Sequence, residues 1–585
     1  MGRIAVLDPA TVNQIAAGEV VERPAAVVKE LLENALDAGA RKIHVEVAGG
    51  GLDRIAVTDD GCGMDPDDAV LAFERHATSK IRQAGDLAAV NTLGFRGEAL
   101  PSIAAVARVT LRTRTRDAPG GVELRLEGGR LLGTSPVGVP AGTTVVVEDL
   151  FFNTPARQKF LRSPSFEGGL CAEAVGRLAL ARPEVAFTLR ANGRQVFATP
   201  GRGNLKETIA AVLGPATARE MVPVTWDGEG ITLDGFAGRP ALTRSSRRQQ
   251  TLIINGRYVK SFIVAGAIDG AYRDFVPAGR HPVVVLHLNI DPAAVDVNVH
   301  PAKLEVKIAD QAALVRLVLA ALRAALGGAA PGRTAADVEA EEPPGRPGPP
   351  AAGGWTGGGG GLPPAGGRFR QAAPELGAAA EALAFYAPAA PSLLRYLGWF
   401  FPTYILAQGP DGLYIIDQHA AHERVLYEEF LDRLSARGGA SQMLAAPVSL
   451  ELGPRETAVA EEYGGILEKL GFIVDSFGGG TAVLRGVPAA GWRGEDAGGA
   501  AELFRDVLER LGESGVSDPV AAHGLLAASL ACHRAVRGGS ALDPAEAQRL
   551  LDRLEAAREP AVCPHGRPTY FKITAAELAR RFQRA

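Results

Sequence analysis

The spacing of apolar residues near the start of the chain predicts an amphipathic helix. We expect it to begin at Pro24, which suits a first helical turn, and to end at Gly39, which suits a helix terminus. Its apolar face would comprise Val27, Val28, Leu31, Leu32, Ala35 and Leu36. Its polar stripe would comprise Glu30, Glu33, Asn34 and Asp37. A polar stripe is usually only the solvated side of a surface helix, so the spacing alone indicates no chemistry.

Short strands and glycine turns follow this helix. Strands are expected at 42–47 and 54–58, and the second leads into Asp59-Asp60-Gly61-Cys62-Gly63. An acid at a strand end beside Gly-x-Gly suits a backbone that approaches a planar ligand, with the carboxylate accepting from an exocyclic amine. Farther on, Gly94 and Gly97 precede a predicted helix, where free amides can receive phosphates. Each of these turns is commonly only a turn, and their order is what favours a nucleotide site.

A third pattern lies in the second half of the chain. The apolar run 413–416 predicts a strand, and the residues after it predict an amphipathic helix. At about 100° per residue, His419 and Glu423 share one face of that helix. An imidazole beside a carboxylate is half of a divalent metal site. The alternative is a solvated helix with Asp417 at its N-cap, and this stretch alone leaves both interpretations open.

Two further segments supply metal-binding residue types. They are Ala531-Cys532-His533 and Cys563-Pro564-His565-Gly566. Pro564 forbids a helix interior and Gly566 allows a tight turn, so a thiolate and an imidazole can face one ion from a loop. Burial in a core is otherwise the commoner role of a lone cysteine.

Composition adds the domain boundaries. The chain has 585 residues, too many for a single hydrophobic core. Glycine, proline and alanine dominate residues 328–391, which predicts a disordered linker. The expected fold class is α/β multidomain, with domains at 1–205, 206–327 and 392–585.

Charge and cysteine content narrow the class of protein. The net charge is only −4, with 46% hydrophobic residues, so a nucleic-acid surface would have to be a local patch. Candidates for that patch are Arg239, Arg244, Arg247, Arg248, Arg257 and Lys260. No apolar run reaches the ~18 residues of a membrane span, and no secretory signal is evident. Four widely spaced cysteines form no disulfide framework and favour a reducing, cytoplasmic location.

Several of these motifs resemble the ATP-binding motifs of the GHKL superfamily, which joins DNA gyrases, a heat-shock chaperone, histidine kinases and the MutL mismatch-repair proteins. They are Glu33-Asn34-Ala35, Asp37-Ala38-Gly39, Asp59-x-Gly61-x-Gly63, Thr78-Ser79-Lys80, Gly94-Phe95-Arg96-Gly97-Glu98 and Ala141-Gly142-Thr143. The segments 15–21, 73–80 and 151–157 resemble the MutL branch in particular. No P-loop sequence occurs, so phosphates would be held in another way.

The resemblance implies a GHKL-type α/β sandwich ATPase domain, a ribosomal-protein-like α/β second domain and an α+β C-terminal dimerisation and endonuclease domain. It implies that Glu33 is the general base of ATP hydrolysis, that Asn34 holds Mg²⁺ and that Asp59 reads the adenine amine. Gly94 to Glu98 would form the lid over the phosphates, and Gly142-Thr143 would close the adenine pocket. Lys303, from the second domain, would reach the γ-phosphate.

The C-terminal segments resemble the motifs of MutL proteins that nick DNA. The pattern D-Q-H-A-x-x-E-x-x-x-x-E is matched at every fixed position from Asp417 to Glu428. The ligands implied for one or two ions are Asp417, His419, Glu423, Cys532, Cys563 and His565. Cysteine and histidine would favour Zn²⁺, and a neighbouring oxygen-rich position would favour Mn²⁺ or Mg²⁺ for hydrolysis. His422 and His533 could alter the set, whereas Glu428, about 140° around the helix from Glu423, is not expected to share its metal.

The resemblance also implies partners. They are DNA, a second copy of the chain in a homodimer, the mismatch-recognition protein MutS and the replication sliding clamp. The clamp contact would use Gln442 to Pro447, inside a regulatory subdomain at about 437–525, although a loop leading into a strand explains this peptide as well. The implied function is an ATP-gated mismatch-repair endonuclease. The alternatives are a non-nicking, ATP-dependent matchmaker with a structural metal and, less favoured, another GHKL machine.

Overall fold

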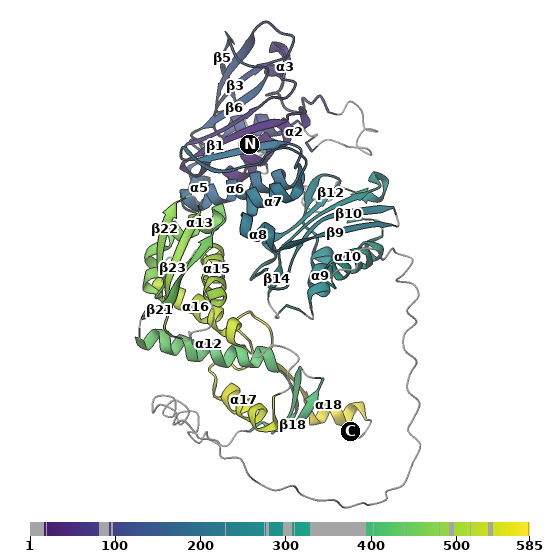
Figure 1. The fold of residues 1–585 in the computed structure, drawn as a ribbon, viewed down its shortest axis with the longest axis vertical. Helices are drawn as coiled ribbons and strands as arrows, with labels where there is room; N and C mark the ends of the chain where they lie inside the picture. Colours follow the sequence, from purple (N-terminus) through teal and green to yellow (C-terminus); the bar gives the residue numbers. More distant parts are fainter. Residues whose placement is uncertain are drawn as a thin grey trace, which may run out of the picture.

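The computed structural model describes residues 17–327 and 393–584 with gaps, the longest of which are 81–92, 297–306, 491–496 and 536–541. Phe95, Arg96, Lys303 and the predicted linker at 328–391 lie outside the described residues. Figure 1 shows the N-terminal half in purple to teal and the C-terminal half in green to yellow. Among the described residues, no helix is both long enough and apolar enough to cross a membrane.

An eight-stranded sheet organises the first part of the chain, in the order β5-β4-β3-β6-β2-β1-β7-β8. Its strands are β1 (Lys42–Ala48), β2 (Arg54–Asp59), β3 (Arg108–Arg114), β4 (Gly121–Glu127), β5 (Arg130–Val137), β6 (Gly142–Glu148), β7 (Ala186–Ala191) and β8 (Arg194–Ala198). The helices of this part are α2 (Pro24–Asp37), α3 (Pro66–Leu71), α4 (Ala99–Ala105), α5 (Pro155–Lys159) and α6 (Pro164–Ala181).

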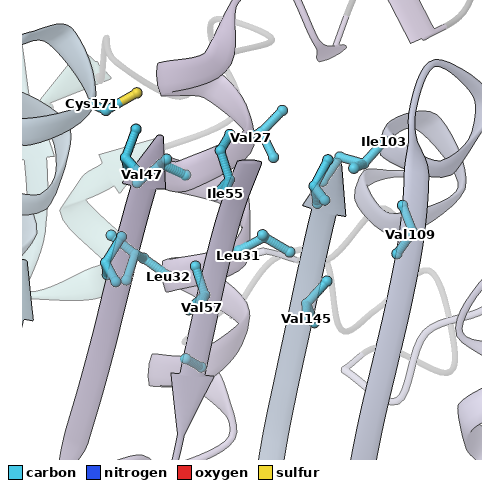
Figure 2. Close-up of a cluster of buried hydrophobic side chains, with 14 of the residues drawn as sticks. Val27, Leu31, Leu32, Val47, Ile55, Val57, Ile103, Val109, Val145 and Cys171 are labelled. Atoms are coloured by element: carbon cyan, nitrogen blue, oxygen red, sulfur yellow. The ribbon is translucent and has the colours of Figure 1, made fainter. Parts of the chain in front are cut away.

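The amphipathic helix predicted from Pro24 is confirmed as α2, which ends at Asp37. Gly39, just beyond it, has a φ of 75°, the left-handed conformation that suits a glycine after a helix. Figure 2 shows the predicted apolar face, including Val27 and Leu31, against side chains of the sheet such as Val57. Because this face packs on the sheet, the polar stripe of α2 lies on the side of the helix that faces away from the sheet.

A five-stranded sheet, in the order β13-β12-β15-β10-β9, organises the next part of the chain. Its strands are β9 (Met221–Gly228), β10 (Ile231–Gly238), β12 (Gln250–Ile254), β13 (Arg257–Val259) and β15 (Val284–Ile290). Its hydrophobic core is shared with α9 (Phe262–Tyr272) and α10 (Gln311–Leu326). The short helices α7 (Leu205–Leu213) and α8 (Pro215–Arg219) connect it to the first part, whereas β11 (Thr243–Arg244) and β14 (His281–Pro282) pair with each other.

Two sheets form the C-terminal half, in the orders β18-β19-β20-β24 and β21-β23-β22. Their strands are β18 (Arg395–Phe400), β19 (Tyr404–Gly409), β20 (Gly412–Asp417), β21 (Ser441–Glu451), β22 (Ile473–Gly478), β23 (Thr481–Pro488) and β24 (Tyr570–Thr574). The helices are α12 (Gln418–Arg437), α13 (Pro454–Glu462), α14 (Gly464–Lys469), α15 (Ala497–Ser514), α16 (Pro519–Arg534), α17 (Pro544–Ala556) and α18 (Ala575–Arg581). The predicted strand at 413–416 and the helix after it are confirmed as β20 and α12.

Candidate functional sites

The polar stripe of α2 meets the segment around Gly94. Lys80 Nζ donates to Asn34 Oδ1 at 3.0 Å and lies 2.6 Å from Asp37 Oδ2. The carboxylate of Asp37 also accepts the backbone amides of Leu93 and Gly94, at 2.8 and 3.0 Å. Asn34, Asp37, Lys80 and Gly94, all predicted nucleotide-site residues, therefore lie in one cluster.

Glu33 lies beside this cluster on α2 and is buried, with 7% of its surface exposed. Its Oε1 is 3.0 Å from Lys29 Nζ, one turn earlier in the helix. Glu33 therefore has a cationic partner on its own helix. An ionised carboxylate next to the cluster could accept a proton from water.

The second part of the predicted site is built on close backbone approach. A Cβ at Gly63 or at Gly142 would lie 2.1 Å from a backbone carbonyl oxygen, and their φ angles are 69° and 121°. Only glycine fits at both positions. Asp59 Oδ1 accepts the amide of Gly61 at 2.9 Å. Burial raises the pKa of Asp59 to about 6, against hydrogen bonds from the backbone of Gly61 and Thr143.

The other described residues of the predicted nucleotide site belong to the Thr78-Ser79-Lys80 motif and to the predicted lid at 94–98. Thr78 Oγ1 accepts the amide of Lys80 at 3.2 Å, and Ser79 is exposed. Gly97 has a φ of 63°, and a Cβ there would lie 2.4 Å from a backbone oxygen. Glu98 immediately precedes α4, as the predicted helix required.

Arg257 is a residue of this cluster whose place sequence reasoning missed. Its Nη1, from β13 in the second sheet, donates to Leu93 O at 3.1 Å. Burial lowers the pKa of Arg257, and the charges of Glu33 and Asp37 oppose that shift. The sequence places it only among the candidates for a nucleic-acid patch. The Asn-Gly pair at 255–256 predicts a tight hairpin that would present Arg257, but not the cluster that it reaches.

The metal-binding residue types of the C-terminal half also converge. Glu423, Cys563 and His565 have ligand atoms within 4.8 Å of one another. Glu423 Oε1 is 3.1 Å from His419 Nε2, and Glu423 Oε2 is 3.1 Å from His565 Nδ1. Cys532 Sγ is 3.4 Å from Glu423 Oε1 and 3.8 Å from His565 Nε2. Asp417 apart, the structure therefore brings all the predicted ligands together.

The chemistry of this metal cluster fits a divalent ion. Burial alone would raise the pKa of Glu423, but hydrogen bonds from His419 and His565 outweigh it and hold the pKa below its usual range. Glu423 is 2% exposed, so its charge needs those partners. Two thiols, two imidazoles and a carboxylate are the donors that Zn²⁺ takes in proteins.

The loop that carries Cys563 is held by α12. Arg424 Nε donates to Val562 O at 2.6 Å. The carboxylate of Glu428 accepts the amides of Arg558 and Glu559, at 2.8 and 3.2 Å. Glu428 therefore positions the loop, in keeping with the expectation that it does not share the metal of Glu423. Within the loop, Gly566 has a φ of 78° and makes the tight turn that was predicted.

Asp417 occupies the N-cap of α12, where its Oδ1 accepts the amide of Ala420 at 3.0 Å. Among the described residues, the set within 4.8 Å does not include it. Its role as a metal ligand stays a prediction.

The two further imidazoles lie outside that set as well. Burial and Arg553 lower the pKa of His422 to about 4. Burial lowers the pKa of His533, and the nearby charge of Asp506 in α15 opposes that shift. Neither contact indicates a metal ligand.

Two arginines of the predicted nucleic-acid patch form ion pairs within the chain. Arg247 pairs with Asp269, and Arg248 pairs with Glu513 of the C-terminal half. The peptide 442–447 lies in β21, an edge strand whose register shifts after Met443, which is 61% exposed.

The chain matches three protein families. Residues 22–127 match the histidine kinase-, DNA gyrase B- and HSP90-like ATPase family, and residues 209–327 match the DNA mismatch repair protein, C-terminal domain. Residues 397–542 match the MutL C-terminal dimerisation domain. Over the full length of both chains, it is 51% identical to the DNA mismatch repair protein MutL of Desulforudis audaxviator and 45% identical to that of Pelotomaculum thermopropionicum.

Solved structures resemble the N-terminal half. The N-terminal domain of a DNA repair protein is 24% identical, with a TM-score of 0.48, over 54% of this chain and 98% of that one. The Aquifex aeolicus MutL ATPase domain complexed with ADP is 30% identical, with a TM-score of 0.38, over 51% of this chain and 98% of that one. Because both scores are low, the assignment rests on the sequence matches.

Proposed function

The chain belongs to the MutL family of DNA mismatch repair proteins, and on that premise we propose that it is an ATP-gated homodimer that nicks DNA with its own C-terminal metal site. It carries a GHKL-type ATPase domain and a MutL dimerisation domain. The metal cluster is the observation that carries the nuclease proposal. Its donors come from three segments of the chain, and the segment with Glu423 is more than a hundred residues from the other two.

Each residue of the metal cluster has a proposed task. Cys532, Cys563 and His565 would hold a Zn²⁺-type ion, with His419 beside them. Glu423 would be shared with a neighbouring Mn²⁺ or Mg²⁺ that Asp417 also binds. An ion bound there would polarise a phosphodiester and lower the pKa of a bound water. Glu423, kept ionised by its histidine neighbours, is ready to bind a cation without first losing a proton.

In the ATPase domain we propose that Glu33 activates water and that Asn34 holds Mg²⁺. Asp59 would accept from the adenine amine, and Lys303 would contact the γ-phosphate. The other proposed nucleotide contacts are Asp37, Gly61, Gly63, Thr78, Ser79, Lys80, Gly142, Thr143 and residues 94–98. The convergence of Asn34, Asp37, Lys80 and Gly94 supports these roles.

The sheet β18-β19-β20-β24 supports a homodimer. Ile405, Ala407 and Ile416 point to one face, into a core shared with α12 and α17. The other face carries apolar side chains on three neighbouring strands, with Leu406 opposite Ile415 and Ile415 opposite Phe571. Phe571, on the edge strand β24, is 58% exposed, and together with Leu406 and Ile415 it extends an apolar surface across three strands that a partner could cover.

We also propose that the protein acts with DNA, MutS and the sliding clamp. The exposed edge strand β21 supports a clamp contact, because a peptide at a sheet edge is accessible to a partner. The free thiols of Cys532 and Cys563 need a reducing compartment, which supports the cytoplasm.

The test is a nicking assay on supercoiled plasmid with Mn²⁺. Asp417→Asn should abolish nicking and keep ATP hydrolysis, because asparagine still caps α12 but carries no charge for a cation. In the ATPase assay, Glu33→Ala should still bind ATP but should no longer hydrolyse it. Retained nicking by Asp417→Asn would exclude the nuclease assignment, and lost ATP binding by Glu33→Ala would exclude the role of Glu33.

One observation favours a second candidate, a non-nicking matchmaker with a structural metal. The cluster is rich in cysteine and histidine, and Asp417 already serves as a helix cap. In that case the purified chain would contain zinc but would not nick plasmid under any divalent ion.

A further inference from the structure

The two halves of the chain are packed against each other through α6 and α13 (Figure 1). Phe166 of α6 belongs to the hydrophobic core of the C-terminal half and is 4% exposed. The guanidinium groups of Arg162 and Arg455 lie 4.5 and 5.2 Å from its ring centroid. A Cβ at Gly169 would lie only 3.1 Å from Arg455 Cα, so the helices approach closely.

The C-terminal end of helix α15 also contacts the N-terminal half. Glu509 and Glu513 lie in its last turns, where carboxylates face the negative end of the helix dipole, and no basic residue stands in the last turn. The missing cation comes from the N-terminal half. Arg162 donates to Gly512 O at 2.6 Å and to Glu513 O at 2.9 Å, and so satisfies carbonyls that the helix itself leaves unpaired.

One face of α15 is acidic along its length. At about 100° per residue its carboxylates fall within about 60°, and we call them the acidic stripe: Glu502, Asp506, Glu509 and Glu513. The N-terminal half supplies a partner for most of this stripe. The contacts are Ser245 and Ser246 with Glu509, Arg248 with Glu513 at 3.1 Å and Arg280 with Glu502 at 3.4 Å.

The edge of the same helix reaches the metal cluster. Arg510 Nε donates to Asp506 Oδ2 at 3.3 Å, and Arg510 Nη2 lies 3.1 Å from His565 Nε2. Asp506 is 3% exposed, so Arg510 is held by a buried carboxylate of the acidic stripe. The apolar side of α15, including Phe504 and Leu508, is packed in the core. Packing along this side makes α15 a rigid connection between its contacts with the N-terminal half and with the metal cluster.

We propose that α15 couples the N-terminal half to the metal cluster. Docking of Arg162, Ser245 and Ser246 fixes α15, and Arg510 then acts as a positioning residue that holds His565 in place for an ion. The route continues to the ATPase domain, because α6 also packs against α2, the helix that carries Glu33. The proposal rests on the metal site described under the proposed function.

The test uses Co²⁺ binding to the full chain, followed by the absorption bands that cysteine ligands give to bound Co²⁺. The docking variant combines Arg162→Ala, Ser245→Ala and Ser246→Ala. Its matched control combines Arg194→Ala and Ser135→Ala, which are exposed positions on edge strands. The docking variant and Arg510→Gln should each weaken Co²⁺ binding about 10-fold and shift the bands, whereas the control should do neither.

The combined variant decides whether the two contacts act in series. If docking acts through Arg510, adding the docking changes to Arg510→Gln should weaken Co²⁺ binding no further. Arg510→Lys should restore part of the affinity. Unchanged Co²⁺ binding by the docking variant, or effects that multiply in the combination, would overturn the coupling while leaving the metal site intact. If the unmodified chain shows no thiolate–Co²⁺ bands, the metal site fails and the coupling fails with it.

Discussion

At the scale of single residues, Asp59 shows how burial raises the pKa of a carboxyl group and so the pH range over which it ionises. Its pKa is raised from 3.8 to about 6 by burial, although the Gly61 amide donates to it at 2.9 Å. The folded chain therefore binds this proton more tightly than the unfolded chain does. Without nucleotide, the contribution of Asp59 to stability decreases as the pH rises from about 4 through 6.

The same shift predicts a pH dependence of ATP binding. An ionised Asp59 is the stronger acceptor for an adenine amine, so ATP affinity should decrease as the pH falls below about 6. In Asp59→Asn this part of the pH dependence should be lost, and calorimetric titration at several pH values measures it.

The matched control for this prediction is Asp227→Asn, since Asp227 is an exposed carboxylate on β9, in the five-stranded sheet rather than beside Asp59. The phosphates of ATP titrate equally in all variants, so only the difference between variants counts. An identical pH profile for Asp59→Asn and the parent would exclude Asp59 as the adenine contact.

At the scale of elements, α12 has two tasks. It presents His419 and Glu423 to the metal cluster, and it holds the loop that brings Cys563 there. Arg424 links the two tasks, because it donates to Val562 O and lies 3.6 Å from Glu428. Its side chain is 6% exposed.

Replacing Arg424 by methionine should therefore affect both stability and metal binding. The change leaves the partly buried Glu428 without its charge partner and Val562 O without its donor, which should cost about 2 kcal/mol in the free energy of unfolding. Zinc affinity should also decrease, because Cys563 loses the support of its loop. Urea unfolding and a zinc-chelator competition measure the two effects. Arg433→Met, exposed on the same helix, is the control and should change the unfolding free energy by less than about 0.5 kcal/mol.

The elements were more predictable than the contacts between them. The apolar period was enough to predict α2 and α12, and Gly39 and Asp417 marked their ends, because these signals are local. For the metal cluster, helical spacing placed only His419 and Glu423 together, and the full ligand set came from the resemblance to MutL proteins that nick DNA. Arg257 and Arg162 were not predictable, since a surface arginine has no local signal for a partner in another domain.

At the scale of the whole molecule, we expect the apolar face of the sheet β18-β19-β20-β24 to form the dimer interface. We expect Phe571→Asp to make the chain monomeric at concentrations where the parent is a dimer. A charge in an apolar interface should cost at least about 3 kcal/mol, or roughly a 100-fold weaker dimer.

Sedimentation velocity measures this change. Leu132→Asp is the control, because Leu132 is 61% exposed on β5 of the ATPase sheet and should leave the dimer intact. A Phe571→Asp variant that stays dimeric would show that the interface lies elsewhere.

The three segments that form the metal cluster are also synthesised at different times. A ribosome adds residues at about 5–20 per second, so Cys563 and His565 appear roughly 7 to 30 s after His419. The helix α2 and its sheet are complete long before that. During synthesis, and in any chain broken off before residue 563, the nucleotide site can therefore exist without the thiolate pair. Under the proposed function, a nascent or truncated product would bind ATP without being able to nick DNA.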